Sequence, residues 1–176
     1  MSEQHQKYCL DANVLIQAWQ KYYSPKFCPD YWTLLNQLGI DDRIFIPQMV
    51  SQEITSTEDD LSEWLKKCKI PIHPIDGPVS ECLKKIYEAN PLHQYLIANS
   101  SQHSLADPWL IAHAINKNAI VVTKEIKDSY NNPTKIKIPH VCDNMGVKWI
   151  NDFEFVEELG IKFRCSLQQA QHDSLF

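Results

Sequence analysis

Four acidic residues in this chain of 176 residues lie where strands and helices are expected to meet. They are Asp11, Glu53, Asp107 and Glu125, and each lies at or just after the end of a strand or near the start of a helix. In an open α/β sheet such boundaries gather at the carboxyl edge of the strands, where ligands bind. Carboxylates crowded there repel one another unless a cation neutralises them, and hard oxygen ligands suit Mg²⁺ or Mn²⁺. The spacing therefore predicts a divalent-metal site.

Carboxylates that share a divalent cation can support the cleavage of phosphodiester bonds. The metal lowers the pKa of a bound water, holds the phosphate oxygens and neutralises the charge that builds up during in-line displacement. The chain contains no nucleophilic Ser or Cys motif that could cleave a phosphodiester bond by another mechanism. The four acids therefore favour a metal-dependent nuclease.

Each of these residues also has a simpler explanation when it is taken alone. Asp11 and Asp107 could each cap the helix that follows, a role that is compatible with metal binding. Glu53 could be a solvated helix residue, and Glu125 could be a surface acid. Thr123 could be a strand residue with no special role. The hypothesis rests on the joint pattern, in which all four acids lie at the expected boundaries of elements.

The hydrophobic pattern predicts strands that alternate with helices. Strands are expected at residues 7–10, 43–46, 119–123 and 147–150, and two prolines exclude a helix from the extended segment at 71–75. Helices are expected near residues 14–22, 30–38, 48–56, 59–68, 79–89, 107–115, 139–145 and 152–159. This alternation indicates one α/β domain with a mostly parallel sheet. We expect the domain to span residues 1–160 and a C-terminal tail to occupy residues 161–176.

Local signals suggest where several of these helices begin and end. Asn13 is expected to cap the first helix, and Asp152 the last. Asp107 and Pro108 fit the N-cap and the first helical position of the helix at 107–115. Gly39 is expected to end the second helix.

The charge of the chain limits how it could bind nucleic acid. The formal net charge is −5, which argues against a large non-specific nucleic-acid surface. It does not exclude a nuclease, because the four site carboxylates supply much of the negative charge and a bound metal would offset them. Lysines could still form a local rim that faces phosphates, at positions 66, 67, 69, 84, 85, 117, 124, 127, 135 and 137.

The sequence favours a cytoplasmic protein. The segment at residues 1–7 is polar and lacks the apolar region of a signal peptide. No apolar run approaches the roughly 18 residues that span a bilayer, so no membrane partner is expected. The six cysteines include no Cys-x-x-Cys pair, and in a reducing compartment we expect them to be free thiols.

The order and flanks of the four acids resemble those of PIN-domain ribonucleases, and in particular the VapC-type toxin endoribonucleases. The resemblance spans roughly residues 7–151 and rests on four segments: Asp11-x-Asn13 after an apolar strand, Val50-Ser51-Gln52-Glu53-Ile54, Ala106-Asp107-Pro108-Trp109-Leu110-Ile111-Ala112-x-Ala114, and Ile120-Val121-Val122-Thr123-Lys124-Glu125. The segment at residues 139–150 also resembles an uncharacterised bacterial PIN-like branch. Each segment is weak alone, whereas their arrangement is specific.

The resemblance implies a three-layer α/β/α PIN-like fold and a site with assigned roles. Asp11, Glu53, Asp107 and Glu125 would be the metal-binding and catalytic acids, supported by Asn13 and Thr123. Thr123 would orient a carboxylate or a metal-bound water. Glu125 stands where the toxin branch commonly has Asp, and Asp128 competes for the same role, which leaves the second metal position the less secure.

The function implied by the resemblance is a Mg²⁺- or Mn²⁺-dependent endoribonuclease that hydrolyses RNA phosphodiester bonds. It would be the toxin of a type II toxin–antitoxin pair, held by a protein antitoxin, and a homodimer is compatible with the resemblance. One alternative is a PIN-like domain with a degraded metal site that acts as a binding or regulatory module. Another is a flavodoxin-like or receiver-type domain that uses an acidic cluster for phosphotransfer. Such a domain usually has adjacent acids near its amino terminus and a Lys after a late strand. Here the amino-terminal acid is single and Lys124 is followed directly by Glu125, which disfavours this alternative. Metal binding that is lost in Asp11→Asn would distinguish the nuclease from the binding module.

Overall fold

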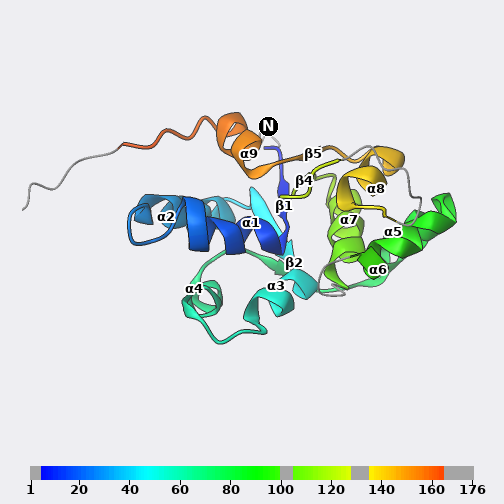
Figure 1. The fold of residues 1–176 in the computed structure, drawn as a ribbon, viewed down its shortest axis with the longest axis horizontal. Coiled ribbons are helices and arrows are strands. Elements are labelled where there is room, and N and C mark those ends of the chain that lie inside the picture. The colour runs from blue at the N-terminus through cyan, green and yellow to red at the C-terminus, as the bar shows by residue number, and fades with distance from the viewer. Residues whose placement is uncertain (1–4, 100–104, 128–134, 165–176) are drawn as a thin grey trace, which may run out of the picture.

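The computed structural model describes residues 5–99, 105–127 and 135–164, and Figure 1 shows their arrangement. The strands of the sheet are β1 (Tyr8–Leu10), β2 (Ile44–Pro47), β3 (Ile72–His73), β4 (Ile120–Val122) and β5 (Trp149–Ile150). Their order across the sheet is β3-β2-β1-β4-β5, and every neighbouring pair is parallel. The central strands β1, β2 and β4 consist of buried residues throughout, as expected for strands covered on both faces.

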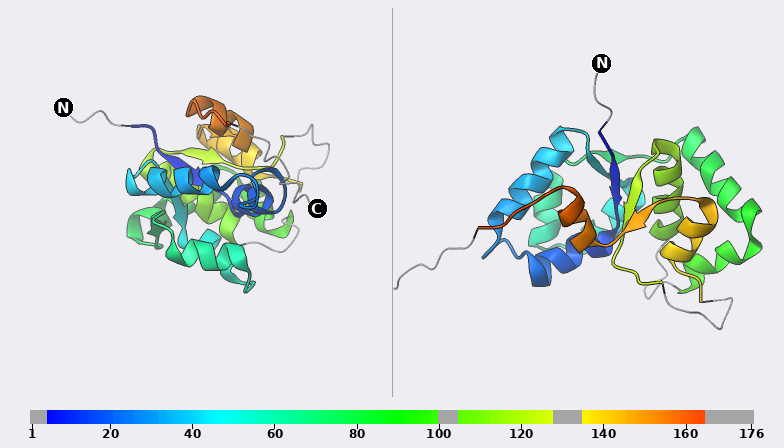
Figure 2. Two further views of the ribbon diagram at one scale, coloured as in Figure 1. Left: turned by 90° about the vertical axis from the view of Figure 1, so that its left-hand side faces the viewer. Right: turned by 90° about the horizontal axis from the view of Figure 1, so that it is seen from above.

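Helices cover both faces of this sheet. The helical segments are α1 (Ala12–Gln17), η1 (Ala18–Tyr22), α2 (Pro29–Ile40), α3 (Gln48–Thr55), α4 (Asp60–Lys67), α5 (Gly77–Ala89), η2 (Pro91–Gln94), α6 (Tyr95–Asn99), α7 (Ala106–Lys117), α8 (Ile138–Met145) and α9 (Asp152–Glu158). Figures 1 and 2 show α1, α2 and α9 on one side of the strands and α5, α7 and α8 on the other. The three-layer α/β/α arrangement predicted from the sequence is therefore confirmed.

The strand order creates a switch point beside β1. From β1 the chain moves outward through β2 to β3, and it then returns to add β4 and β5 on the opposite side. Leu10 at the end of β1 is in register with Val122 at the end of β4. Ligands of open α/β sheets bind at such a point, outside the carboxyl ends of the strands. The topology thus directs attention to the residues that follow β1 and β4.

Two of the expected helix starts are wrong by a short distance. Helix α1 begins at Ala12, so Asn13 lies inside its first turn and Asp11 occupies the N-cap position without a side-chain capping bond. Helix α7 begins at Ala106, which places Asp107 in its first turn and not at the N-cap. The carboxylate of Asp11 accepts a hydrogen bond across the sheet from Thr123, and a hydrogen bond with the backbone of the adjacent Ala12 lowers its pKa.

Gly39 and Asp152 also differ from their expected roles. Gly39 lies inside α2, where an added Cβ would approach the Cα of Ile70 to 2.7 Å. Because that contact is with backbone, Gly39 permits close packing of α2 against the segment before β3 and does not end the helix. The N-cap of α9 is Asn151, whose side chain accepts hydrogen bonds from the backbone N–H groups of Phe153 and Glu154. Asp152 is the first helical residue and is free to act elsewhere.

Two further features of the described residues bear on the sequence predictions. No helix in these ranges has both the length and the apolar character needed to cross a membrane. The described cysteines form no disulfide. Burial raises the pKa of the Cys9 and Cys142 thiols well above the ordinary value, so both remain protonated core residues.

Candidate functional site

Asp11 and Thr123 lie side by side at the switch point. The backbone N–H of Asp11 donates to the carbonyl oxygen of Val122 at 3.0 Å, which continues the pairing of β1 with β4 by one residue. The N–H of Thr123 donates to the carbonyl oxygen of Ile150 at 3.0 Å, on the other side of β4. These backbone bonds fix both residues to the rigid centre of the sheet. Their positions are therefore set by strand pairing and not by a flexible loop.

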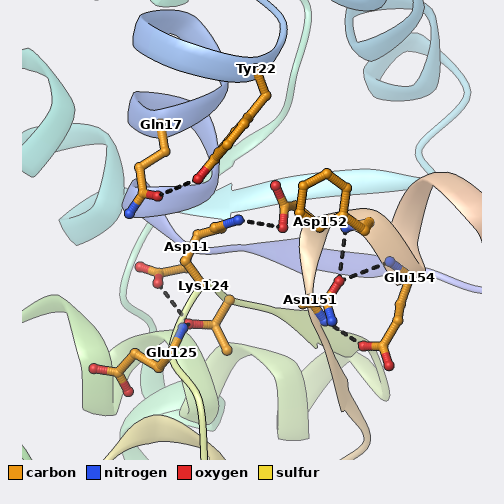
Figure 3. A network of polar contacts seen from close by, with 10 residues as sticks. Asp11, Gln17, Tyr22, Lys124, Glu125, Asn151, Asp152 and Glu154 are labelled. Carbon is orange, nitrogen blue, oxygen red and sulfur yellow. Dashed lines mark hydrogen bonds and ion pairs between the residues drawn. The ribbon is translucent and has the colours of Figure 1, made fainter. Parts of the chain in front are cut away.

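Thr123 links two of the four acids, Asp11 and Glu125, through its hydroxyl group, and Figure 3 shows these two acids. The Oγ1 atom donates to Oδ2 of Asp11 at 2.9 Å, and it accepts from the backbone N–H of Glu125 at 3.2 Å. Thr123 is fully buried, so its two hydrogen bonds are shielded from solvent. The sequence predicts that Thr123 orients a carboxylate, and in the structure the carboxylate in contact with it is that of Asp11.

Asp11 carries a carboxylate whose negative charge is poorly compensated. Its side chain is almost completely buried. Burial, the largest cause, raises its pKa from the usual 3.8 to about 7, and the hydrogen bond from Thr123 lowers it only in part. The negative charges of Glu125 and Glu53 raise it further, so these acids are near enough to affect Asp11. A bound cation would remove much of this cost.

Glu53 and Asp107 reach the same end of the sheet from two helices. Helix α3, which carries Glu53, follows β2 directly, and Glu53 is half-buried. Helix α7 ends shortly before β4 begins and runs back along it, so its N-terminal turn lies at the carboxyl end of the sheet. That turn carries Asp107, which is 8% exposed. Helices α3 and α7 pack against each other.

Glu125 has a structural contact in addition to its place near Asp11. Its Oε2 atom accepts a hydrogen bond at 2.7 Å from the backbone N–H of Ile138, the first residue of α8. The N-terminal end of a helix favours a negative charge, so this contact stabilises the start of α8. One oxygen of Glu125 is therefore already engaged. No local sequence pattern indicates this role, because Glu125 and Ile138 are thirteen residues apart.

The donor chemistry of this site fits Mg²⁺ or Mn²⁺, although the acids do not form a closed cage. Within residues 5–99, 105–127 and 135–164, no group of three or more His, Cys, Asp or Glu side chains is arranged to hold a metal ion. Mg²⁺ typically retains several waters and uses only one or two protein carboxylates. The buried Asp11 carboxylate, with two further acids acting on it, meets that smaller requirement.

Two predicted residues remain, Asn13 and Asp128. Asn13 is exposed on the first turn of α1, two residues after Asp11. Asp128 lies outside the residues that the structure describes. In the described site, Thr123 is therefore hydrogen-bonded to the Asp11 carboxylate and to the backbone of Glu125, and the charges of Glu125 and Glu53 act on Asp11.

A buried ion pair beside the site was not predicted from the sequence. The Nζ atom of Lys124 lies 2.7 Å from Oδ1 of Asp152, and the two side chains are 15% and 1% exposed. The ammonium group also lies 4.6 Å from the ring centroid of Tyr22 and 4.8 Å from that of Phe153. Figure 3 shows Lys124, Asp152 and Tyr22 close to Asp11. It fastens α9 to the strand end that carries Thr123.

Two solved structures have a similar fold. A chain from the crystal structure of VapBC2 from Rickettsia felis, bound to a DNA fragment from their promoter, is 18% identical with a TM-score of 0.51. A chain from the crystal structure of FitAcB from Neisseria gonorrhoeae is 16% identical with a TM-score of 0.50. In both cases the similarity covers 83% of this chain and 98% of the other chain. These similarities confirm the PIN-like, VapC-type fold that the sequence predicts.

The sequence itself is matched by a family of proteins but by no curated protein. The match extends over residues 8–163 and so includes the whole sheet, Asp11, Thr123 and Glu125. This range is most of the chain, and the protein therefore belongs to the family described as a domain of unknown function, DUF4411.

Proposed function

We propose that this protein is a Mg²⁺- or Mn²⁺-dependent endoribonuclease that hydrolyses RNA phosphodiester bonds. The observation that carries the proposal is the buried Asp11 carboxylate at the switch point of a PIN-like sheet. Its pKa is raised to about 7 by burial and by the charges of Glu125 and Glu53. Perturbed carboxylates in such positions are candidates for functional sites, because structure alone gains nothing from burying an uncompensated charge.

Asp11, Glu53, Asp107 and Glu125 would hold the cation in this proposal. When bound, the cation would lower the pKa of a water and offset the charge that develops on the phosphate. Thr123 keeps Asp11 in one orientation through the hydroxyl bond at 2.9 Å, and it anchors the backbone of Glu125. Asn13 would support the acids from the first turn of α1, and Asp128 is the competing candidate for the role of Glu125.

The same proposal includes a role and a partner. The resemblance of the acidic segments to VapC-type toxins supports a toxin of a type II toxin–antitoxin pair, and such a toxin requires a protein inhibitor. An Arg or Lys of that partner could pair with the site carboxylates where the cation would bind. RNA would be the substrate, and the acidic site would admit its phosphates only with the cation bound.

A second function is a binding or regulatory module with a degraded metal site. The contact of Glu125 with the backbone of Ile138 favours it, because that carboxylate is engaged in stabilising α8. The lack of a preformed three-ligand group in the described part of the chain points in the same direction. Such a module would bind its partner without Mn²⁺ and would cleave nothing.

Cleavage of a mixed RNA substrate in Mn²⁺ distinguishes the two functions. We expect wild type and Asp60→Asn to cleave, where Asp60 is an exposed aspartate on α4. Asp11→Asn should not cleave, and EDTA should stop the wild-type reaction. Calorimetry should detect Mn²⁺ binding to wild type but not to Asp11→Asn. Absence of both cleavage and Mn²⁺ binding in purified wild type would exclude the nuclease and leave the binding module.

A further inference from the structure

A cavity of about 390 Å³ lies where the end of η1, the start of α2 and the segment after α9 meet. Four aromatic rings line it, and three of them are exposed. We call these three rings, together with the two cations of the lining, the aromatic groove: Tyr22, Phe27, Phe163, Lys162 and Arg164. Asp30 also contributes an acidic group to the lining. None of these residues belongs to the predicted acidic site, so their shared position requires a separate explanation.

The three rings of the aromatic groove are unusually exposed for their type. Phe27 is 66% exposed, Phe163 40% and Tyr22 38%. Single exposed apolar residues are common, but several around one hollow indicate a binding surface. Phe163 is held by parallel stacking on Tyr23, with ring centroids 5.2 Å apart, and Tyr23 stacks in turn on the buried Tyr31. The groove is thus supported from within and does not depend on a ligand to form.

Tyr22 connects the aromatic groove to the acidic site. Its ring lies 4.6 Å from the ammonium group of Lys124, and Lys124 directly follows Thr123 in the sequence. Thr123 in turn holds the carboxylate of Asp11. Figure 3 shows Tyr22, Lys124 and Asp11 close together. A ligand that reaches the acidic site could therefore extend along the surface into the groove.

The composition of the aromatic groove fits a polyanion that carries flat rings. Lys162 and Arg164 are exposed and can pair with phosphates, while exposed aromatic rings can stack on bases. The chain has a net charge of −5 and a cluster of acids at its site, and these charges repel phosphates. Residues outside the acidic site must therefore contribute to the binding of a nucleic acid. Stacking meets this need because it does not depend on the net charge of the protein.

We propose that the aromatic groove binds single-stranded RNA, with bases stacked on its rings and phosphates paired with its two cations. Bases in a single strand have free faces for stacking, whereas those in a duplex do not. This inference deepens the proposed nuclease function by naming the form of the substrate and the surface that holds it. A protein segment is the competing occupant, and the experiments below distinguish the two.

The first experiment measures the affinity of the protein for a fluorescein-labelled single-stranded RNA of about ten nucleotides by anisotropy in EDTA. EDTA prevents metal-dependent cleavage, so binding is measured alone. Phe27→Leu and Tyr22→Leu keep an apolar side chain but remove a ring, and each should weaken binding by about tenfold. Tyr87→Leu, at a partly buried tyrosine on α5, is the matched control and should bind as wild type does. Thermal unfolding of each variant would verify that it is folded.

The second experiment tests the two cations through the salt dependence of binding. Lys162→Gln combined with Arg164→Gln should lower the slope of log affinity against log salt by about 1.4, the value expected for two lost phosphate contacts on a single strand. Lys148→Gln removes an exposed lysine just before β5, outside both the aromatic groove and the rim suggested by the sequence, and should leave the slope unchanged. A duplex of the same RNA sequence should bind more weakly than the single strand.

Failure of the groove and failure of the nuclease give different results. Unchanged RNA affinity in Phe27→Leu and in the double variant at positions 162 and 164 would overturn the groove, even if wild type cleaves RNA. Wild type that does not cleave, but loses RNA affinity in these variants, would retain the groove and overturn the nuclease. Duplex RNA bound as tightly as the single strand would contradict stacking and therefore the proposal. If Phe27→Leu binds RNA as wild type does but binds a protein partner more weakly, the groove would be assigned to that partner.

Discussion

Two buried aspartates on either side of the end of β4 differ in how their charge is balanced. Asp152 is 1% exposed, and the ammonium group of Lys124 lies 2.7 Å from its Oδ1. Asp11 is 3% exposed, and its side-chain donor is the neutral hydroxyl of Thr123. The nearby Glu125 and Glu53 add negative charge around Asp11. One carboxylate has a cation built into the fold, whereas the other, when ionised, has a burial cost that an external cation would remove.

This difference separates a structural role from a functional one. Lys124 and Asp152 come from β4's end and α9, and their pairing holds these two segments together. A buried ion pair of this kind can serve conformational specificity, but it contributes little evidence of function. A buried carboxylate without a cation destabilises the fold, and it persists at a site where a ligand can compensate for it. The comparison therefore predicts opposite responses to the loss of each charge.

The largest expected effect is on cleavage. Asp11→Asn preserves the shape of the side chain and its ability to accept from Thr123, but it removes the charge that would hold the cation. We expect RNA cleavage to fall by on the order of a hundredfold or more, above the loss typical of a group that only supports a metal ligand. Asp152→Asn should retain cleavage wherever the variant is folded. Equal loss in both variants, measured with the same RNA at matched folded fractions, would contradict the division of roles.

The next effect is on stability as a function of pH, without metal. The pKa of Asp11 is raised from 3.8 to about 7, so the folded protein favours the protonated form. The resulting destabilisation is absent below about pH 4, grows as the pH rises and is complete above about pH 7. Its ceiling is about 4 kcal/mol, since each tenfold change in acid dissociation corresponds to about 1.4 kcal/mol. In EDTA, Asp11→Asn should therefore unfold at higher urea than wild type at about pH 8, with a smaller difference at about pH 5.

Metal should reverse this pH effect in wild type but not in Asp11→Asn. Mn²⁺ at about a hundredfold excess over its Kd should raise the free energy of unfolding of wild type by about 2.7 kcal/mol at high pH, because it binds the folded state only. Asp11→Asn should show no such increase. The control Asp60→Asn should behave as wild type does in both buffers. A wild-type stability that does not fall relative to that of Asp11→Asn between about pH 5 and about pH 8 would contradict an uncompensated carboxylate at position 11.

The third effect tests the other aspartate. Asp152→Asn leaves the ammonium group of Lys124 without its carboxylate, and breaking a buried pair in this way costs about 3 kcal/mol in the free energy of unfolding. Adding Lys124→Met to Asp152→Asn removes the remaining charge and should recover a large part of that loss. Urea unfolding of the single and double variants measures both changes. A double variant less stable than Asp152→Asn would show that Lys124 contributes mainly through Tyr22 and Phe153.

The fold was more accessible from the sequence than the site was. Apolar runs such as Ile44–Pro47 and Ile120–Val122 revealed the strands, because a parallel sheet covered on both faces requires continuous hydrophobic residues. Because these strands alternate with helices, only a few arrangements of a parallel sheet are compatible with the sequence. Gly39 was misread because its role depends on the backbone of Ile70, far away in the sequence. Sequence pattern therefore predicted elements well and close contacts between elements poorly.

For the site, the sequence identified residue types but not their partners. Asp11 and Thr123 were both selected, and their hydrogen bond depends on the register of β1 with β4, which no local pattern encodes. The pairing of Lys124 with Asp152 was missed because the two residues are 28 positions apart and each had a local explanation. The aromatic groove was missed for the same reason, since its residues come from two distant parts of the chain.

The smallest expected effect concerns Glu125, which combines both kinds of role. Its carboxylate accepts from the N–H of Ile138 at 2.7 Å, as a structural group would, and its charge also raises the pKa of Asp11, as a site acid would. Glu125→Gln keeps an acceptor for Ile138, so the free energy of unfolding should change little, whereas Glu125→Ala should lower it by about 1 kcal/mol, the usual cost of a lost helix cap. Mn²⁺ affinity, measured by calorimetry, should fall by about tenfold in both variants, because both remove the charge. Full Mn²⁺ affinity in Glu125→Gln would assign Glu125 to the structural side of the comparison, together with Asp152, and would leave Asp11 as the acid on which the site depends.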